Sequence, residues 1–262
     1  MCLLEHTDWI GAITAFAALC AALIAGLSLR QLKDQTSASY KPHLVLEEAW
    51  ALIKGLDGNG ATLFPAKWVR HFLPPHGIVG AESPTAKPLF PLALYNVGLG
   101  AAASVEFEWQ FDLDTHIARV NARMGALPED QRISALIRDD TFLMNPDGAN
   151  AKMSFWGMRL QSDLKSQIHA LLPTSQKSDP FELDLPSSYV LLASGYLHTA
   201  IPGNSKNEIE VPSIDLLVRY QDIGRIAHST KFHIEPIISI SADRFWAVRF
   251  AVSVVDMGKS KY

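Results

Sequence analysis

The stretch WIGAITAFAALCAALIAGLSL, from Trp9 to Leu29, contains no charged side chain. A helix of this length spans about 30 Å, the thickness of a bilayer's hydrocarbon core. The hydroxyls of Thr14 and Ser28 can hydrogen-bond back to the helix backbone. The sequence therefore predicts four segments: a short N-terminal tail (1–8), a transmembrane helix (9–29), a juxtamembrane linker (30–42) and a folded domain (43–262).

A cleaved signal peptide is the main alternative for this segment. Such a signal has a basic N-terminal region, an apolar run of about 7–15 residues and small residues before the cleavage site. The tail MCLLEHTD instead carries Glu5 and Asp8 and no basic residue, and the apolar run is longer. Lipoprotein cleavage before Cys20 would need a small residue where Leu19 stands. An uncleaved anchor is therefore favoured over a signal peptide and over a buried helix of a soluble protein.

The charges around the segment predict its orientation. No Lys or Arg precedes Trp9, whereas Arg30, Lys33 and Lys41 follow Leu29. Basic flanks stay on the cytoplasmic side. We therefore expect a single-pass protein of the cell inner membrane, with the N-terminus outside and the domain in the cytoplasm. An envelope sensor with an extracytoplasmic domain is the alternative.

One face of the predicted helix consists of small residues. Thr14, Ala18, Ala22 and Gly26 recur at every fourth position. Such a face lets two membrane helices approach closely and pack. A helix this rich in alanine also gives the same spacing by chance, so self-association through this face is an interpretation that the sequence leaves open.

Composition restricts the function classes. The chain has 262 residues, a net charge of −4 and 19% charged residues. The domain has no basic excess, so nucleic acid is not an expected partner. Both cysteines, Cys2 and Cys20, precede the domain, which therefore contains no disulfide. This usage is expected in a reducing cytoplasm.

The domain is predicted to be rich in strands. From Val105 to Thr115 apolar and polar residues alternate, which predicts one strand with a buried face and a solvated face. The tetrapeptide Gln221–Gly224 suits a hairpin turn. Further strands are predicted at Leu44–Trp50, Leu89–Tyr95, Tyr189–Thr199, Ile214–Tyr220, Arg225–Glu235 and Phe245–Val255.

The middle of the chain has helical spacing instead. Residues 128–137 begin with Pro-Glu-Asp, which is typical of a helix N-terminus, and Met158–Leu172 repeats the apolar spacing of a helix. We therefore predict a helical insertion at about 117–180. The expected fold class is an N-terminal transmembrane α-helix followed by a mainly-β domain, an antiparallel β-sandwich of the immunoglobulin-like kind with this insertion.

A turn motif carries a partial resemblance. Asn96, Gly98, Gly100 and Ala102 form Asn-x-Gly-x-Gly-x-Ala after a predicted strand, and a strand–YQDIGR–strand hairpin follows late in the chain. Behind one N-terminal membrane helix, this pattern resembles a scattered class of bacterial membrane-anchored proteins of uncharacterised activity. The resemblance covers about a third of the chain, and it implies a fold and a bacterial source without implying an activity.

The glycine-rich segments do not predict a nucleotide site. Gly98 and Gly100 lack a third glycine and are followed by a predicted strand, so no helix N-terminus faces a phosphate. Gly55, Gly58 and Gly60 lack the Lys and Ser/Thr of a phosphate-binding loop. The 96–100 segment is therefore interpreted as a turn, and no cofactor is expected.

Catalytic and metal sites are not predicted either. The acidic residues of the 105–115 segment are interpreted as a solvated face paired with cations of a neighbouring strand, and Asp112, Asp114 and His116 are the least improbable metal ligands. His228 and His233 fall on opposite faces of one strand. No His-Glu-x-x-His or Gly-x-Ser-x-Gly motif is present.

These observations favour a membrane-anchored binding or scaffold protein without catalytic activity. Its expected partners are the lipid bilayer, an unidentified protein or small molecule, and a second copy through the transmembrane helix. The alternative is a membrane effector of a bacterial defence system, whose anchor helices would assemble and perturb the membrane.

Overall fold

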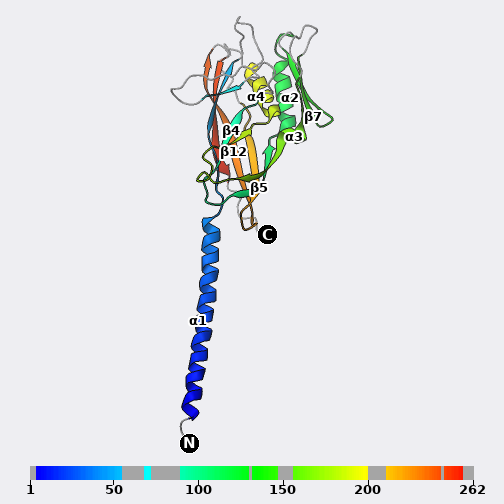
Figure 1. Ribbon diagram of the computed structural model, residues 1–262. Coiled ribbons are helices and arrows are strands. Elements are labelled where there is room, and N and C mark those ends of the chain that lie inside the picture. The colour runs from blue at the N-terminus through cyan, green and yellow to red at the C-terminus, as the bar shows by residue number, and fades with distance from the viewer. Residues whose placement is uncertain are drawn as a thin grey trace.

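A single long helix projects from a β-rich domain in the computed structural model, which describes residues 4–54, 68–71, 89–129, 132–146, 156–199, 211–242 and 245–255 (Figure 1). The helix α1 runs from Leu4 to Ser39 and so extends into both the expected tail and the expected linker. Its apolar part, Ile13–Leu32, has a mean hydropathy of 1.9, and none of it is buried. By its length and composition, this exposed apolar helix is compatible with a membrane anchor or a signal sequence.

The domain is built mostly from antiparallel strands. A seven-stranded sheet has the order β3-β2-β13-β12-β11-β5-β9, and two three-stranded sheets have the orders β1-β4-β10 and β6-β7-β8. The strands are β1 (Leu44–Leu46), β2 (Ala49–Lys54), β3 (Trp68–His71), β4 (Pro91–Asn96), β5 (Ala102–Gln110), β6 (Ile133–Arg138), β7 (Thr141–Pro146), β8 (Trp156–Arg159), β9 (Lys165–Leu171), β10 (Phe181–Asp184), β11 (Ile214–Gln221), β12 (Ala227–Ala242) and β13 (Phe245–Val255).

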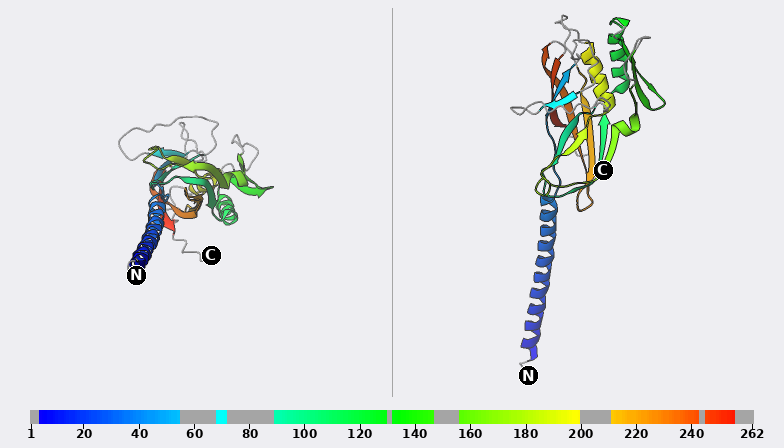
Figure 2. Two further views of the ribbon diagram at one scale, coloured as in Figure 1. Left: turned by 60° about the horizontal axis from the view of Figure 1, so that its bottom comes forward. Right: turned by 45° about the horizontal axis from the view of Figure 1, so that its top comes forward.

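The large sheet is curled, and the main core lies between it and the sheet β1-β4-β10 (Figure 2). Leu94 of β4 and Phe107 of β5 are both fully buried in this core. Phe107 also stacks on Phe181 of β10, with ring centroids 5.6 Å apart, so the two sheets contact each other directly. The immunoglobulin-like sandwich is not confirmed, because seven described strands share one sheet instead of dividing four and three between two.

The strand predicted at Tyr189–Thr199 is wrong, because these residues belong to the helix α4 (Ser187–His198). The helix is buried on all sides. Tyr189 and Val190 face the main core, whereas Leu191 and Leu192 face a second core under the helix α2 (Leu113–Met124). A helix buried all round has no polar face, so its short apolar sequence cannot be distinguished from that of a buried strand. Asp163 accepts hydrogen bonds from the backbone N–H groups of Ser187 and Ser188, both at 2.9 Å, and so caps α4 from outside the helix.

The helical insertion at about 117–180 is also corrected. Its described residues contain the four strands β6, β7, β8 and β9, and apart from the C-terminal part of α2 the only α-helix among them is α3 (Leu160–Leu164). The strands β6 and β7 are joined by Asp139 and Asp140, which both have positive φ. Two such residues form a type I′ hairpin turn, which usually carries Asn-Gly or Asp-Gly. The sequence lacks that glycine, which is why the hairpin was not predicted.

The strand predicted over Val105–Thr115 is correct only for its first part. Val105, Phe107 and Trp109 are buried as the alternation requires, but β5 ends at Gln110. Asp112 then accepts a hydrogen bond from the backbone N–H of Thr115 at 3.1 Å and begins α2. An Asp in this N-cap position favours a helix over continued strand. The strand predictions at 214–220 and 245–255 are confirmed, and the strand predicted at 225–235 begins at Ala227 and continues to Ala242.

Candidate functional site

The junction between α1 and the domain is the first candidate site, and it is organised by Asn96. The side chain is 1% exposed. Its Oδ1 accepts hydrogen bonds from the backbone N–H groups of His43 and Gly98, both at 3.1 Å. Its Nδ2 donates to the carbonyls of Gly100 (2.8 Å) and Leu171 (3.1 Å). Every donor and both acceptor positions of the amide are used, so one side chain connects the helix exit to the start of β5 and the end of β9, which pair with each other.

The two glycines of the turn allow the chain leaving α1 to lie directly against the domain. A Cβ at Gly98 would be 2.4 Å from the carbonyl oxygen of Lys41, and one at Gly100 would be 1.7 Å from that of Tyr40. Both contacts are with backbone, which cannot swing aside as a flexible side chain can. The predicted turn therefore also provides the surface against which the linker packs.

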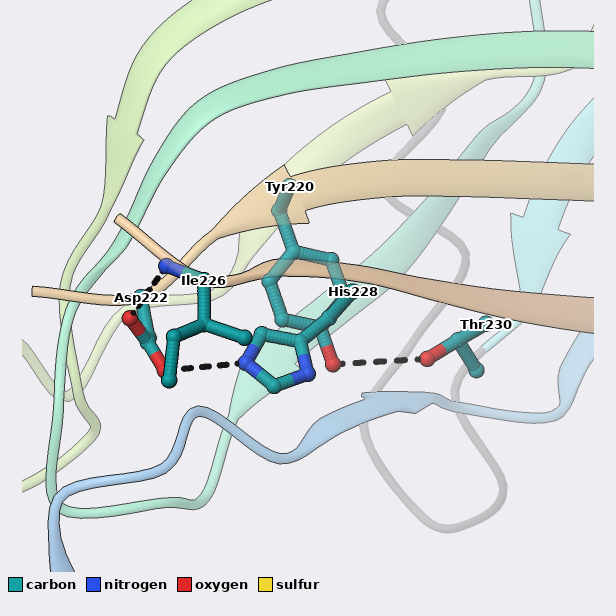
Figure 3. Close-up of polar contacts among 5 residues, drawn as sticks. All are labelled: Tyr220, Asp222, Ile226, His228 and Thr230. Carbon is teal, nitrogen blue, oxygen red and sulfur yellow. Dashed lines mark hydrogen bonds and ion pairs between the residues drawn. The ribbon is translucent and has the colours of Figure 1, made fainter. Parts of the chain in front are cut away.

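The hairpin between β11 and β12 lies beside this junction (Figure 3). Asp222 is buried and accepts hydrogen bonds from the backbone N–H of Ile226 and from Nε2 of His228, both at 2.9 Å. Because a carboxylate can only accept, Nε2 of His228 carries the proton. The imidazole stacks on the ring of Tyr220, with centroids 5.5 Å apart. A cleft of about 390 Å³ separates this group from the linker residues Lys41–Leu44.

Acidification is expected to cancel the stabilisation that Asp222 provides. The hydrogen bond from His228, followed by those from the backbone of Ile226 and Gly224, holds the pKa of Asp222 below its ordinary value. The contribution is therefore complete above the unfolded value, near pH 4, and is lost as the pH falls through the folded pKa. Asp222→Asn should lower the thermal unfolding midpoint near pH 7, and the difference between the midpoints of the variant and the wild type should narrow as the pH falls below the ordinary pKa of an aspartate.

The control for this measurement is Asp139→Asn, which changes a carboxylate whose side chain is 92% exposed. The difference between the unfolding midpoints of Asp139→Asn and the wild type should stay constant as the pH is lowered. If the unfolding midpoint of Asp222→Asn differs from that of the wild type by the same amount at neutral and acid pH, the ionised carboxylate of Asp222 does not stabilise the fold as assigned.

The second candidate site is a cleft of about 760 Å³ between α2, α4 and β12. His116, Arg119 and Arg123 line it from α2, and Tyr196 lines it from α4. Nδ1 of His116 lies 3.1 Å from the hydroxyl of Tyr196, and the guanidinium carbon of Arg123 is 5.0 Å from the centroid of the Tyr196 ring. The wall formed by α2 is therefore cationic and held in place by an aromatic ring.

The opposite wall of this cleft is mainly apolar. It includes Val211, Pro236, Ile237 and Ile238, and it has one carboxylate, Glu235. Two guanidinium groups against one carboxylate leave a net positive charge. The cleft therefore suits a ligand that has an anionic group.

On the acidic face of β5, Glu108 forms the predicted ion pairs with neighbouring strands, whereas Asp112 and Asp114 lie at the N-terminus of α2 and not on a strand. Glu108 binds Arg219 of β11 at 2.7 Å and Lys165 of β9 at 3.3 Å. The hydrogen bond from Arg219 holds the pKa of Glu108 below its ordinary value, with a further contribution from Lys165. Within the described residues, no three His, Cys, Asp or Glu side chains are close enough to hold a metal ion.

The predicted anchor residues all lie on α1. Trp9, Leu29 and Arg30 are exposed, and Lys33 lies in the helix with its side chain outside the described residues. Thr14, Ala18, Ala22 and Gly26 are exposed along the helix, and their association with a second copy stays a prediction. Gly55, Gly58 and Gly60 lie outside the described residues.

The cationic cleft was not predicted from the sequence. His116, Arg119 and Arg123 have the spacing of one helix face. Arg119 and Arg123 fall within the predicted helical insertion, but the start of α2 at Leu113 was not predicted, so His116 was not placed on the same helix face.

Neither a protein-family model, nor a curated protein, nor a solved structure matches this chain.

Proposed function

We propose that this chain is a membrane-anchored binding protein, held in the bilayer by α1, that captures an anionic ligand in the cleft between α2, α4 and β12. The observation that carries the proposal is the cleft wall on which Arg119 and Arg123 stand beside Tyr196. The ligand is a small molecule or a protein segment with a carboxylate or phosphate group. The role is binding without catalysis.

The proposal that α1 is an anchor is supported by its long, exposed apolar part and by the packing of the following linker against the domain. Ile13–Leu32 is long enough to cross a hydrocarbon core. Arg30 follows the predicted span and favours a cytoplasmic domain. Full-length protein should stay in membranes during alkaline carbonate extraction, and a periplasm-active reporter fused after Tyr262 should be silent. Release of the protein, or trimming near residue 30, would contradict the anchor.

The binding half is tested with citrate as the anionic probe. Citrate at tenfold above its dissociation constant would stabilise the folded state by about 1.4 kcal/mol, which raises the unfolding midpoint by about 3–5 °C. Sodium chloride at the same ionic strength is the reference. We expect the citrate shift to disappear in the double variant Arg119→Glu, Arg123→Glu.

The matched control is Arg138→Glu, which reverses an exposed arginine at the end of β6, outside the cleft. It should keep the full citrate shift. A shift that survives the double variant, or one lost equally in Arg138→Glu, would show that citrate acts on general surface charge and would overturn the assignment of the cleft.

A further inference from the structure

The end of the domain from which α1 emerges is unusually apolar. Outside α1, the five most exposed large hydrophobic side chains among the described residues are Val254, Ile223, Leu99, Ile226 and Val97. Val254 and Ile223 are 66% and 65% exposed. We call these five residues the apolar rim.

All five residues of the apolar rim lie around the junction with α1. Val97 and Leu99 belong to the turn on which Tyr40–His43 rest. Ile223 and Ile226 lie in the hairpin loop after β11, whose last residue pairs with Ala103 near the start of β5. Val254 lines the cleft that Lys41 also lines. Figures 1 and 2 both show the hairpin loop at the α1 end of the domain.

The charges among the apolar rim favour a lipid surface. Arg225 stands between the two isoleucines at the hairpin tip, with positive φ and an exposed side chain, and Lys41 is exposed at the helix exit. The carboxylate of the same loop, Asp222, is turned inward and bound to His228. A surface that exposes apolar side chains and cations, and buries its carboxylate, fits the boundary between acyl chains and anionic headgroups.

The length of α1 brings this surface close to the bilayer. From Leu32, where the apolar part ends, to Ser39, where the helix ends, is about 10 Å at 1.5 Å per residue. The headgroup layer occupies about 5–7 Å on each side of the hydrocarbon core. An untilted helix would therefore hold the domain just above the headgroup layer, and the tilt of about 20° that is common for membrane helices brings one side of the domain down to it.

We infer that the apolar rim rests in the headgroup layer of the membrane and forms a second contact beside α1. This inference depends on the proposed anchoring by α1. The contact fixes the orientation of the domain on the bilayer and keeps the cationic cleft between α2, α4 and β12 turned to the solvent.

Depth-dependent quenching of a fluorophore on single cysteines tests this contact. Full-length protein is reconstituted in vesicles of phosphatidylcholine and phosphatidylserine that contain brominated lipids. One protein keeps only Cys20, in a C2S background, and reports on the anchor. Two others, I223C and I137C in a C2S, C20S background, report on the apolar rim and on an exposed isoleucine of β6.

The expected result is quenching of the Cys20 and I223C labels, together with a blue shift of the I223C emission, and no quenching of I137C. Quenching of Cys20 without quenching of I223C would overturn the second contact and leave the anchor intact. Disulfide cross-linking of unlabelled I223C between chains, without quenching, would assign the apolar rim to a second copy instead. An unquenched Cys20 label would overturn the anchor and the second contact together.

Discussion

Replacing Asn96 with alanine is expected to destabilise the domain by about 3–5 kcal/mol, the largest effect of any single polar substitution considered for this protein. The change leaves the N–H groups of His43 and Gly98 and the carbonyls of Gly100 and Leu171 without their partner. An unsatisfied buried polar group costs about 1–3 kcal/mol, and part of that cost is relieved where water enters. Urea unfolding of the full chain in detergent micelles, followed by tryptophan fluorescence, measures the loss.

Asn121→Ala is the matched control, because this asparagine also bridges two elements. It donates to the carbonyl of Ala135 at 2.7 Å and accepts from the N–H of the same residue at 2.8 Å, and it is only half-buried. With two contacts in place of four, we expect a loss of about 1–2 kcal/mol.

Only Asn96→Ala should also loosen the linker, which chymotrypsin detects by faster cleavage after Tyr40. Equal destabilisation by the two variants, with no change in cleavage, would show that Asn96 does not hold the junction.

Introducing a methyl group at Gly100 is expected to displace the linker from the domain. The new Cβ would lie 1.7 Å from the carbonyl oxygen of Tyr40, and the obstacle is backbone. Overpacking of this kind costs about 1–3 kcal/mol, and we expect Gly100→Ala to fall at the upper end, because the β4–β5 turn and the linker must both move. Thermal unfolding gives the stability, and chymotrypsin cleavage after Tyr40 gives the exposure of the linker.

Gly125→Ala serves as the control for this substitution. Gly125 follows α2 with ordinary helical φ, and the nearest atom to its added Cβ is 3.5 Å away. It should be neutral or stabilising by about 0.4–1 kcal/mol, since alanine restricts the unfolded chain. If Gly100→Ala is as stable and as resistant to chymotrypsin as Gly125→Ala, the linker does not pack closely against the turn.

The sequence predicted best where local periodicity decides the structure. The apolar run from Trp9 needs no partner to indicate a helix, because its length alone matches a bilayer. The strand β11 alternates buried residues with half-buried or exposed ones over its length, and the turn residues that follow it place the hairpin with β12. From Val105 onward β5 follows the same rule, and Glu108 on its polar face forms an ion pair with Arg219 of the neighbouring strand.

Short apolar runs were decided only by the tertiary structure. The segment Ser187–His198 lies between two hydrophobic cores, so both of its faces are buried. Its sequence therefore lacks the alternation of polar and apolar faces that would indicate a helix. Ile133–Arg138 is a strand because it pairs with β7 through a turn of two aspartates. In both cases the information lies in contacts made elsewhere in the chain.

The candidate sites also differ in how far the sequence predicts them. The sequence by itself determined an apolar N-terminal helix, a strand-rich domain and a turn at Asn96–Gly100. Only the tertiary structure showed that the turn seats the linker, because His43 and Leu171 lie 53 and 75 residues from Asn96 along the chain. The cationic cleft likewise needs α2 packed against α4. Local patterns decide which segments fold regularly, whereas the partners of a buried polar group are set by how distant segments pack.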